Sequence, residues 1–93
     1  MIKTRVALSL FVGLAAGPAF AATYDGTCTT APEAQWLSEA DARAKLAEAG
    51  YTVSKFKRTR TGNCYEAYVT DNSGKRMELF LDPTNAKIVH SQE

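Results

Sequence analysis

The 93-residue sequence contains one histidine, His90, and two cysteines, and its six glycines are too scattered to form a phosphate-binding loop. A serine or cysteine nucleophile needs a base, which is usually a histidine, and the only histidine stands close to the C-terminus. A zinc site needs three or four histidine, cysteine or acidic ligands, and one histidine does not anchor such a site. We therefore expect a protein that is not an enzyme and that uses no metal and no cofactor.

Long apolar runs are also missing. The longest, residues 6–16, is interrupted by serine and glycine and is too short for a membrane span, which needs about 20 residues. Lys3 and Arg5 precede this run and an Ala-Phe-Ala cleavage motif follows it at residues 19–21, which is the pattern of a secretory signal peptide. We predict a cleaved signal peptide over residues 1–21, with a retained helical anchor as the alternative, and no membrane span in the mature chain.

A large excess of charge of one sign is absent as well. Eleven basic and ten acidic residues give a net charge of +1, and removal of Lys3 and Arg5 with the signal peptide leaves −1. A chain so close to neutral is not expected to bind nucleic acid. We expect a periplasmic or secreted protein whose partner is an envelope or secreted protein.

Cys28 and Cys64 lie 36 positions apart in a mature chain that is too small to bury a large core. In the oxidising compartment that a signal peptide implies, such a pair persists as a disulfide. Chain-entropy arithmetic assigns a loop of this length about 4 kcal/mol of stabilisation. A redox pair or a pair of metal ligands is the alternative, although a redox pair usually has the C-x-x-C spacing.

Residues 22–35 show no hydrophobic periodicity, and we expect them to form an N-terminal arm ahead of a single domain over residues 36–93. Ser38 is a good N-cap residue, and residues 39–49 place small apolar and charged side chains at helical spacing. Gly50 then provides a stop signal. The sequence therefore predicts a short amphipathic helix between Ser38 and Gly50.

After Gly50 the hydrophobic period changes from 3.6 to 2. Short connections rich in turn-forming residues join the alternating segments, so consecutive strands should be antiparallel neighbours. The predicted strands cover residues 51–59, 63–71, 75–82 and 86–90. The predicted fold class is α+β, with one amphipathic helix packed on a four-stranded antiparallel β-meander, one disulfide and a cleaved N-terminal signal peptide.

Alternation assigns each strand residue to one of two faces of this sheet. The inner face, which we expect to pack against the helix, carries Tyr65, Ala67, Val69, Met77, Leu79, Leu81 and Ile88. The outer face carries Glu66, Tyr68, Arg76, Glu78 and Phe80. Val53 and Phe56 have opposite parity, so either a bulge lies near residues 54–55 or Phe56 points to the outer face.

Glu66 and Glu78 are cross-strand neighbours in this arrangement, with Lys55, Lys57 and Arg76 nearby. A pair of carboxyl groups in a cleft can hydrolyse glycosides. Ion pairs across a solvated sheet face explain these residues better, because both signs of charge are present.

Three segments, AGYTV at residues 49–53, CYEAY at 64–68 and GKRMELFLDP at 74–83, follow one another in the order found in PepSY domains. Together with Cys28, they make the chain resemble the small secreted single-domain PepSY proteins that carry one cysteine pair. The resemblance implies a binding module without catalytic residues. PepSY domains occur in propeptides of thermolysin-like secreted metallopeptidases and in bacterial envelope proteins, so the implied function is modulation or inhibition of a peptidase.

The last hairpin departs from the Asp-Pro-x-Thr-Gly pattern that the resemblance implies, because Asn85 and Ala86 stand in place of Thr-Gly. Glycine at such a turn normally supplies a positive φ, which alanine resists by about 1 kcal/mol. We expect Asn85 to take the left-handed conformation instead, because asparagine tolerates it.

Four cations gather within six residues of the first strand and its turn: Lys55, Lys57, Arg58 and Arg60, with Phe56 among them. A charged edge strand that resists edge-to-edge aggregation is the interpretation that we favour for this segment. The alternative is a basic edge that meets an acidic partner, an anionic lipid headgroup or nucleic acid, with Lys55, Lys57 and Arg58 steering the encounter.

Aromatic side chains rimmed by charge are typical of the centre of a protein interface. We expect Phe80 and Tyr68, with Phe56, to be partner-binding anchors. In the alternative arrangement the 22–35 arm, with Tyr24, covers them. A groove between the arm and the sheet would also suit the alternative function, a periplasmic small-ligand or metal-sensing protein.

Overall fold

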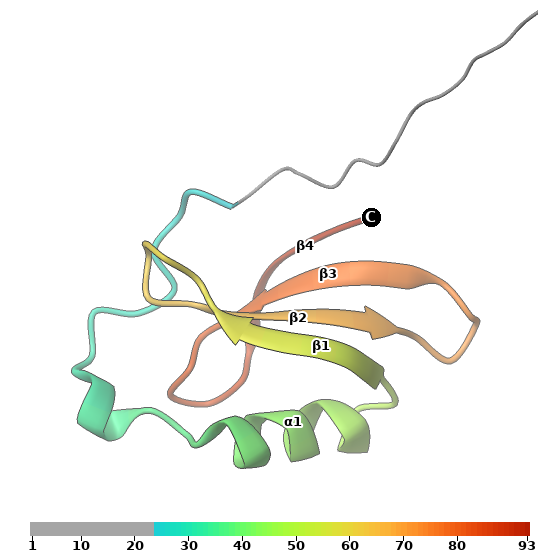
Figure 1. The fold of residues 1–93 in the computed structure, drawn as a ribbon, viewed down its shortest axis with the longest axis horizontal. Coiled ribbons are helices and arrows are strands. Elements are labelled where there is room, and N and C mark those ends of the chain that lie inside the picture. The colour runs from blue at the N-terminus through green and yellow to red at the C-terminus, as the bar shows by residue number, and fades with distance from the viewer. Residues whose placement is uncertain (1–23) are drawn as a thin grey trace, which may run out of the picture.

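The computed structural model describes residues 24–93, so the signal peptide predicted over residues 1–21 lies outside the described residues. One α-helix lies along one face of a four-stranded sheet, beside β1 (Figure 1). The elements are η2 (Glu33–Gln35), α1 (Glu39–Glu48), β1 (Thr52–Arg58), β2 (Tyr65–Thr70), β3 (Arg76–Leu81) and β4 (Ile88–Gln92). The predicted α+β fold class is confirmed. Within residues 24–93, the one α-helix is too short and too polar to cross a membrane.

Local interactions explain where α1 begins and ends. The Ser38 hydroxyl accepts a hydrogen bond from the backbone N–H of Asp41 at 3.0 Å, which caps the first turn. Gly50 follows the helix with φ at +98°, and a Cβ there would meet the Asn72 side chain at 2.8 Å. Glycine is therefore favoured at this position by its positive φ, and a larger residue would also have to displace the Asn72 side chain.

The sheet is an antiparallel meander with the order β1-β2-β3-β4, so β1 and β4 are its edges. The turn between β2 and β3 is fixed by Asp71, whose Oδ1 accepts hydrogen bonds from the Ser73 N–H, the Ser73 hydroxyl and the Lys75 N–H. Gly74 in the same turn has φ at +89°. The predicted meander is present because each connection is short and has the side chains that its turn requires.

A bulge in β1 decides the position of Phe56. The pairing of β1 with β2 shifts between Val53 and Lys55, which leaves Ser54 as the extra residue. The shift turns Phe56 to the inner face, where it is buried and its ring centroid lies 4.9 Å from that of Tyr65. Phe56 is therefore part of the core, and the expectation that it is an exposed anchor is wrong.

The core lies between α1 and the inner face of the sheet. Ala42 is fully buried, and its small side chain lets the helix approach the strands. The Tyr65 hydroxyl donates a hydrogen bond to the Leu37 carbonyl at 2.7 Å, so this buried polar group is satisfied. The buried core residues are Ala42, Leu46, Phe56, Tyr65, Ala67, Val69, Leu79 and Leu81.

Ile88 is not among the core residues. It is 44% exposed, although alternation predicts it on the inner face. The reason is the position of the helix, which packs beside β1 while β4 forms the opposite edge of the sheet. The side chain of Ile88 therefore points to the inner face of the sheet, but α1 does not cover that edge.

The last hairpin differs from the sequence-based expectation at one residue. Ala86, not Asn85, has the positive φ, at 64°. The backbone N–H of Ala86 donates to the Asp82 carbonyl at 2.7 Å, and the Asp82 carboxylate accepts hydrogen bonds from the Thr84 N–H and hydroxyl. The turn therefore keeps the geometry of a glycine-containing hairpin and imposes it on alanine.

Candidate functional site

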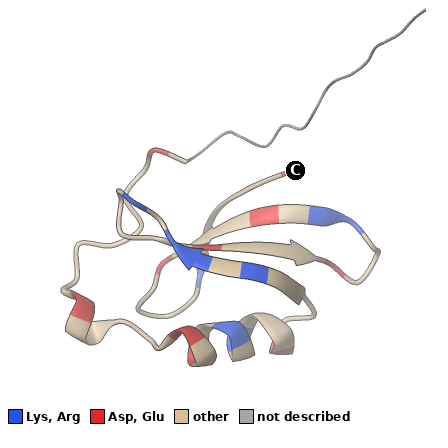
Figure 2. Cartoon of the chain, in the orientation of Figure 1, with Lys and Arg blue, Asp and Glu red and all other residues tan. Residues whose placement is uncertain are grey.

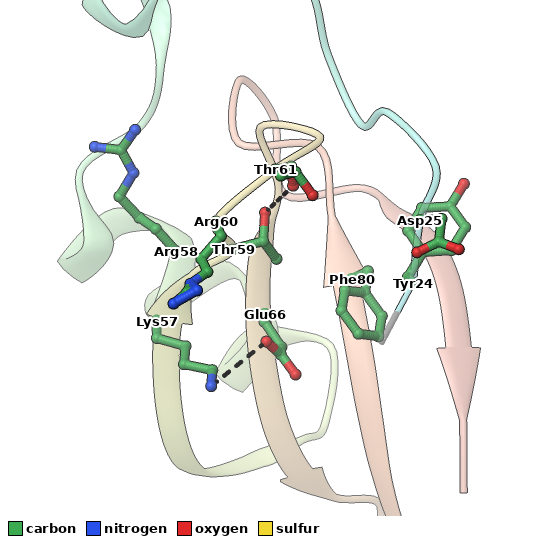
Figure 3. A pocket seen from close by; sticks show the side chains of 9 residues that line it. All are labelled: Tyr24, Asp25, Lys57, Arg58, Thr59, Arg60, Thr61, Glu66 and Phe80. Atoms are coloured by element: carbon green, nitrogen blue, oxygen red, sulfur yellow. Dashed lines mark hydrogen bonds and ion pairs between the residues drawn. The ribbon is translucent and has the colours of Figure 1, made fainter. Parts of the chain in front are cut away.

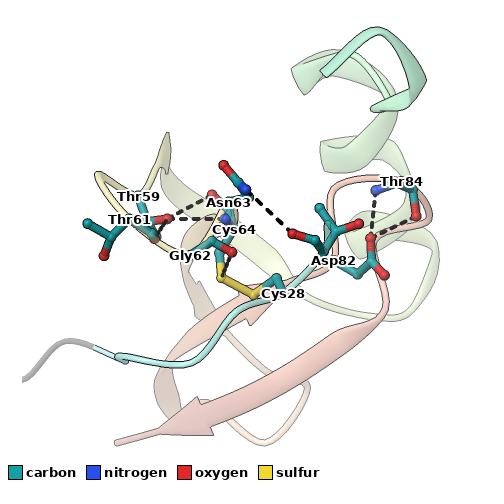
Figure 4. Close-up of a disulfide and its surroundings, with 9 residues drawn as sticks. Cys28, Thr59, Thr61, Gly62, Asn63, Cys64, Asp82 and Thr84 are labelled. Carbon is teal, nitrogen blue, oxygen red and sulfur yellow. Dashed lines mark hydrogen bonds between the residues drawn. A yellow bond between two sulfur atoms is a disulfide. The ribbon is translucent and has the colours of Figure 1, made fainter. Parts of the chain in front are cut away.

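The Cys28–Cys64 disulfide fixes the N-terminal arm against the start of β2 (Figure 4). The backbone N–H of Cys28 donates to the Gly62 carbonyl at 2.8 Å, and both cysteines are buried. The arm passes so close to the β1–β2 turn that a Cβ on Gly62 would lie 2.4 Å from the Gly26 carbonyl oxygen. The predicted disulfide is present, and it places the arm on the outer face.

The arm covers Phe80. The Tyr24 ring lies 5.5 Å from the Phe80 ring and stacks on His90 at 4.5 Å, with an interplanar angle of 10°. Phe80 is 1% exposed and forms a small second core with the two cysteines. The expectation that Phe80 is an exposed anchor is therefore wrong, and the alternative, in which the arm covers this ring, describes the structure.

Two carboxyl groups are buried beside Phe80. Glu66 and Glu78 are 5% and 7% exposed, stand on adjacent strands and hydrogen-bond to each other. Lys57 Nζ lies 3.9 Å from Glu66 Oε1, and Gln92 Nε2 donates to Glu78 Oε1 at 3.2 Å. The sequence predicts Glu66 and Glu78 on a solvated face among ion pairs. Glu66 does pair with Lys57, but both carboxyl groups are buried.

Burial, the hydrogen bond to Glu78 and the negative charge of Glu78, in that order of size, together raise the pKa of Glu66 to about 7. The positive charge of Lys57 opposes this rise. Desolvation also raises the pKa of the Tyr68 hydroxyl, which hydrogen-bonds to the carboxyl pair. At neutral pH the pair therefore holds one proton for much of the time.

A pocket of about 320 Å³ lies between the arm and the β1–β2 hairpin (Figure 3). Glu66 and Phe80 lie at its base, and the side chains of Lys57 and Arg60 approach it from the hairpin. Arg58 points away from it. The charged and aromatic lining residues are Tyr24, Asp25, Lys57, Arg58, Arg60, Glu66 and Phe80.

The chain matches the family model described as peptidase propeptide and YPEB domain, over residues 5–92. It belongs to the PepSY family. PepSY domains occur in extracellular or envelope proteins and are generally non-catalytic, propeptide-like or inhibitor-like modules. Comparisons with curated proteins and with solved structures found no match.

The basic residues predicted to act together are divided between the two faces of this PepSY domain. Lys55 lies over the Tyr68 ring at 5.6 Å on the outer side, where Lys57 pairs with Glu66. Arg58 faces the opposite way, over the Trp36 ring at 4.7 Å, and forms an ion pair with Glu33. Strand alternation separates them, and Figure 2 shows the resulting distribution of charge along β1.

Sequence reasoning missed that Arg60, Asp25 and Glu66 line one pocket. Arg60 follows β1 in the turn, where parity gives no direction, and Asp25 reaches the pocket only because the disulfide holds the arm there. Among residues 24–93 no three His, Cys, Asp or Glu side chains are grouped so as to hold a metal ion. His90 instead contacts Gln92 Oε1 at 3.2 Å and supports Tyr24.

Proposed function

We propose that this protein is an exported, non-catalytic module that binds a peptidase and restrains it. The observation that carries the proposal is the match to a peptidase propeptide family over nearly the whole chain. The paucity of histidine and the use of both cysteines in a disulfide support a binding role over a catalytic one. The predicted signal peptide supports export to the periplasm or the exterior.

The edge strand β1 is the surface we propose for this contact. Within residues 24–93 it has a neighbouring strand on one side only, so its other side can accept an extended segment of a partner. Lys57 and Arg58 have about half of their side-chain surface exposed, and Lys55 is exposed as well. The longer regular stretch of β1, which follows the Ser54 bulge, is the part that carries these cations.

Tyr68, which is half-buried beneath Lys55, is still one of the residues that we propose to contact the partner. Phe56 and Phe80 are not, because both side chains are buried. Acidic segments of the partner would be steered by the cations, and the backbone of β1 would provide hydrogen bonds. Because exposed cations add rate and selectivity more than affinity, each one should contribute modestly.

The test is inhibition of secreted peptidases by the purified, oxidised protein. We would measure residual activity of a panel of thermolysin-like metallopeptidases and secreted serine peptidases with rising protein concentration. The Lys55→Glu variant should weaken inhibition about fivefold to tenfold. The matched control is Lys45→Glu, an exposed cation of α1, which should leave inhibition unchanged.

Absence of inhibition across the panel at micromolar concentration would overturn the proposal. Equal loss in both variants would remove β1 as the contact surface. Loss on substituting Val89, an exposed residue of β4, would move the contact to the other edge of the sheet.

A second candidate function, sensing of a small ligand, is favoured by the pocket between the arm and the hairpin. The metal-sensing form has no supporting group of donors among residues 24–93. A thermal-shift screen of organic acids separates ligand sensing from peptidase binding, because a sensor should be stabilised by a free ligand in the absence of any protein.

A further inference from the structure

We propose that the pocket between the arm and the β1–β2 hairpin receives a carboxylate side chain of the bound protein, and that the Glu66–Glu78 pair makes this binding depend on pH. The statement that the carboxylate belongs to a bound protein rests on the proposed function. The binding of a carboxylate by the pocket does not, and it can be tested on its own.

The cations of the pocket are only partly neutralised within it. Arg60 has no ion-pair partner among residues 24–93, and Lys57 lies 3.9 Å from Glu66, beyond the range of a direct charged hydrogen bond. Asp25 is the one acidic residue that the arm adds to the lining. Two cations against one exposed carboxylate leave a site that favours an anion while Glu66 is protonated.

The aromatic wall selects the kind of anion. The half-buried Tyr24 ring presents apolar surface opposite Lys57 and Arg60, and the buried Phe80 ring supports it (Figure 3). A glutamate side chain fits this division, because its methylene groups can pack on the Tyr24 ring while its carboxylate reaches the cations. A compact, fully hydrated anion would leave the aromatic wall unused.

The carboxyl pair supplies the dependence on pH. Both groups are more than nine-tenths buried and hydrogen-bonded to each other, with one lysine at 3.9 Å, so both cannot be ionised without a large electrostatic cost. When the proton leaves, the Glu66 charge repels an incoming carboxylate and attracts Lys57 to itself. Binding should therefore weaken as pH rises through the neutral range.

Other charged groups surround the pair and must be controlled for. They are Lys55 and Lys57 of β1, Tyr68 of β2, Arg76 of β3, His90 of β4 and Asp25 of the arm. Gln92 links the pair to His90, because its amide nitrogen donates to Glu78 and its oxygen contacts His90. Glu66→Gln is the decisive variant, since it removes the titrating carboxyl group and leaves His90 in place.

The experiment uses protein secreted by an expression host and two fluorescein-labelled octapeptides, one alternating Glu and Val and the other alternating Gln and Val. Fluorescence polarisation gives Kd between about pH 5.5 and pH 8.5 at constant ionic strength. The Glu peptide should bind at least about fivefold more tightly than the Gln peptide, and its Kd should rise about fivefold from the acid to the alkaline end. Arg60→Gln should weaken binding about fivefold, whereas Lys45→Gln on α1 should not.

Glu66→Gln should bind with the affinity of the wild type at acid pH and lose the dependence on pH. Asp25→Asn should tighten binding at every pH. Equal binding of the two peptides, no effect of Arg60→Gln, or an unchanged pH profile in Glu66→Gln would each overturn the proposal. Circular dichroism and the melting temperature establish that each variant is folded.

The outcome for the pocket is separable from that for the peptidase. If the wild type inhibits a peptidase and Arg60→Gln inhibits it equally at every pH, the pocket proposal is wrong and the proposed function stands. If no peptidase is inhibited, the proposed function fails, and the peptide titrations still decide whether the pocket binds a carboxylate.

Discussion

Raising the pH from about 5 to about 8 should destabilise this domain, because the folded chain holds a proton that the unfolded chain releases at lower pH. The site of that proton is the buried Glu66–Glu78 pair on the outer face. In most small domains stability rises with pH over part of this range, because cations and hydrogen-bond donors in the folded chain stabilise their ionised carboxylates. The direction of the effect is therefore informative about the pair.

The magnitude follows from the pKa of Glu66. Burial, first, and then the contact with Glu78 raise this pKa from 4.5 to about 7. One pKa unit corresponds to about 1.4 kcal/mol, so the stabilisation amounts to about 3 kcal/mol when complete. It is fully present below the pKa of the unfolded chain and is lost as pH rises through the folded value. About 2 to 3 kcal/mol of the free energy of unfolding should disappear between pH 5 and pH 8.

Other shifted groups titrate outside this window. The hydrogen bond from the Ser73 hydroxyl lowers the pKa of Asp71 below its usual value of 3.8. The hydrogen bond to Glu93 raises the pKa of Lys75 above its usual value of 10.5. Neither group changes its charge between pH 5 and pH 8 in either the folded or the unfolded chain.

Urea unfolding of the oxidised protein, followed by Trp36 fluorescence, measures the effect. With an m-value of about 1 kcal/mol/M for a domain of this size, the midpoint should fall by about 2 to 3 M across the range. Glu66→Gln should remove most of this slope, because it leaves all other titratable side chains in place. Glu48→Gln, an exposed position on α1, should retain it. A midpoint that stays constant or rises from pH 5 to pH 8, or a slope that survives in Glu66→Gln, would refute the reasoning.

Three further predictions concern the covalent chain and its backbone. Replacing both Cys28 and Cys64 by serine should cost about 4 kcal/mol of stability, measured by urea unfolding, and a smaller loss than about 1 kcal/mol would contradict the role given to the disulfide. Ala86→Gly should stabilise the domain by about 1 kcal/mol, because Ala86 has φ at 64°. Gly74→Ala should destabilise it by a similar amount, because Gly74 has φ at +89° although there is open space around the new Cβ. A loss of stability in Ala86→Gly would contradict the turn geometry. Mass spectrometry of the secreted protein should find Ala22 at its N-terminus, and an intact leader would contradict the signal-peptide prediction.

The sequence predicts the helix and the meander because their signals are local. Ser38, Gly50 and the alternation of the strands each act within a few residues of where they stand. Parity also predicts correctly that Glu66 and Phe80 share the outer face. Alternation does not predict whether a residue on that face is buried. The arm that covers Phe80 comes from a segment without periodicity, so its position could not be predicted.

The remaining differences also arise from interactions between distant parts of the chain. The bulge at Ser54 is one of two arrangements that the sequence allows, and packing of Phe56 against Tyr65 favours it. Ala86 takes the left-handed conformation because it occupies the glycine position of the Asp-Pro-x-Thr-Gly hairpin, whose backbone geometry is kept. Asn85 has the better intrinsic preference for a positive φ. Residue preferences are small beside the hydrogen bonds that Asp82 makes in this turn.

The outer face of the sheet is completed by a covalent bond between cysteines rather than by another element of secondary structure. In the oxidised protein the Tyr24 ring lies against Phe80 and His90, in a segment that the disulfide ties to the sheet. We expect reduction to release this ring and to expose Phe80 and the neighbouring carboxyl pair to water. Oxidation would then change which chemical surface the molecule displays.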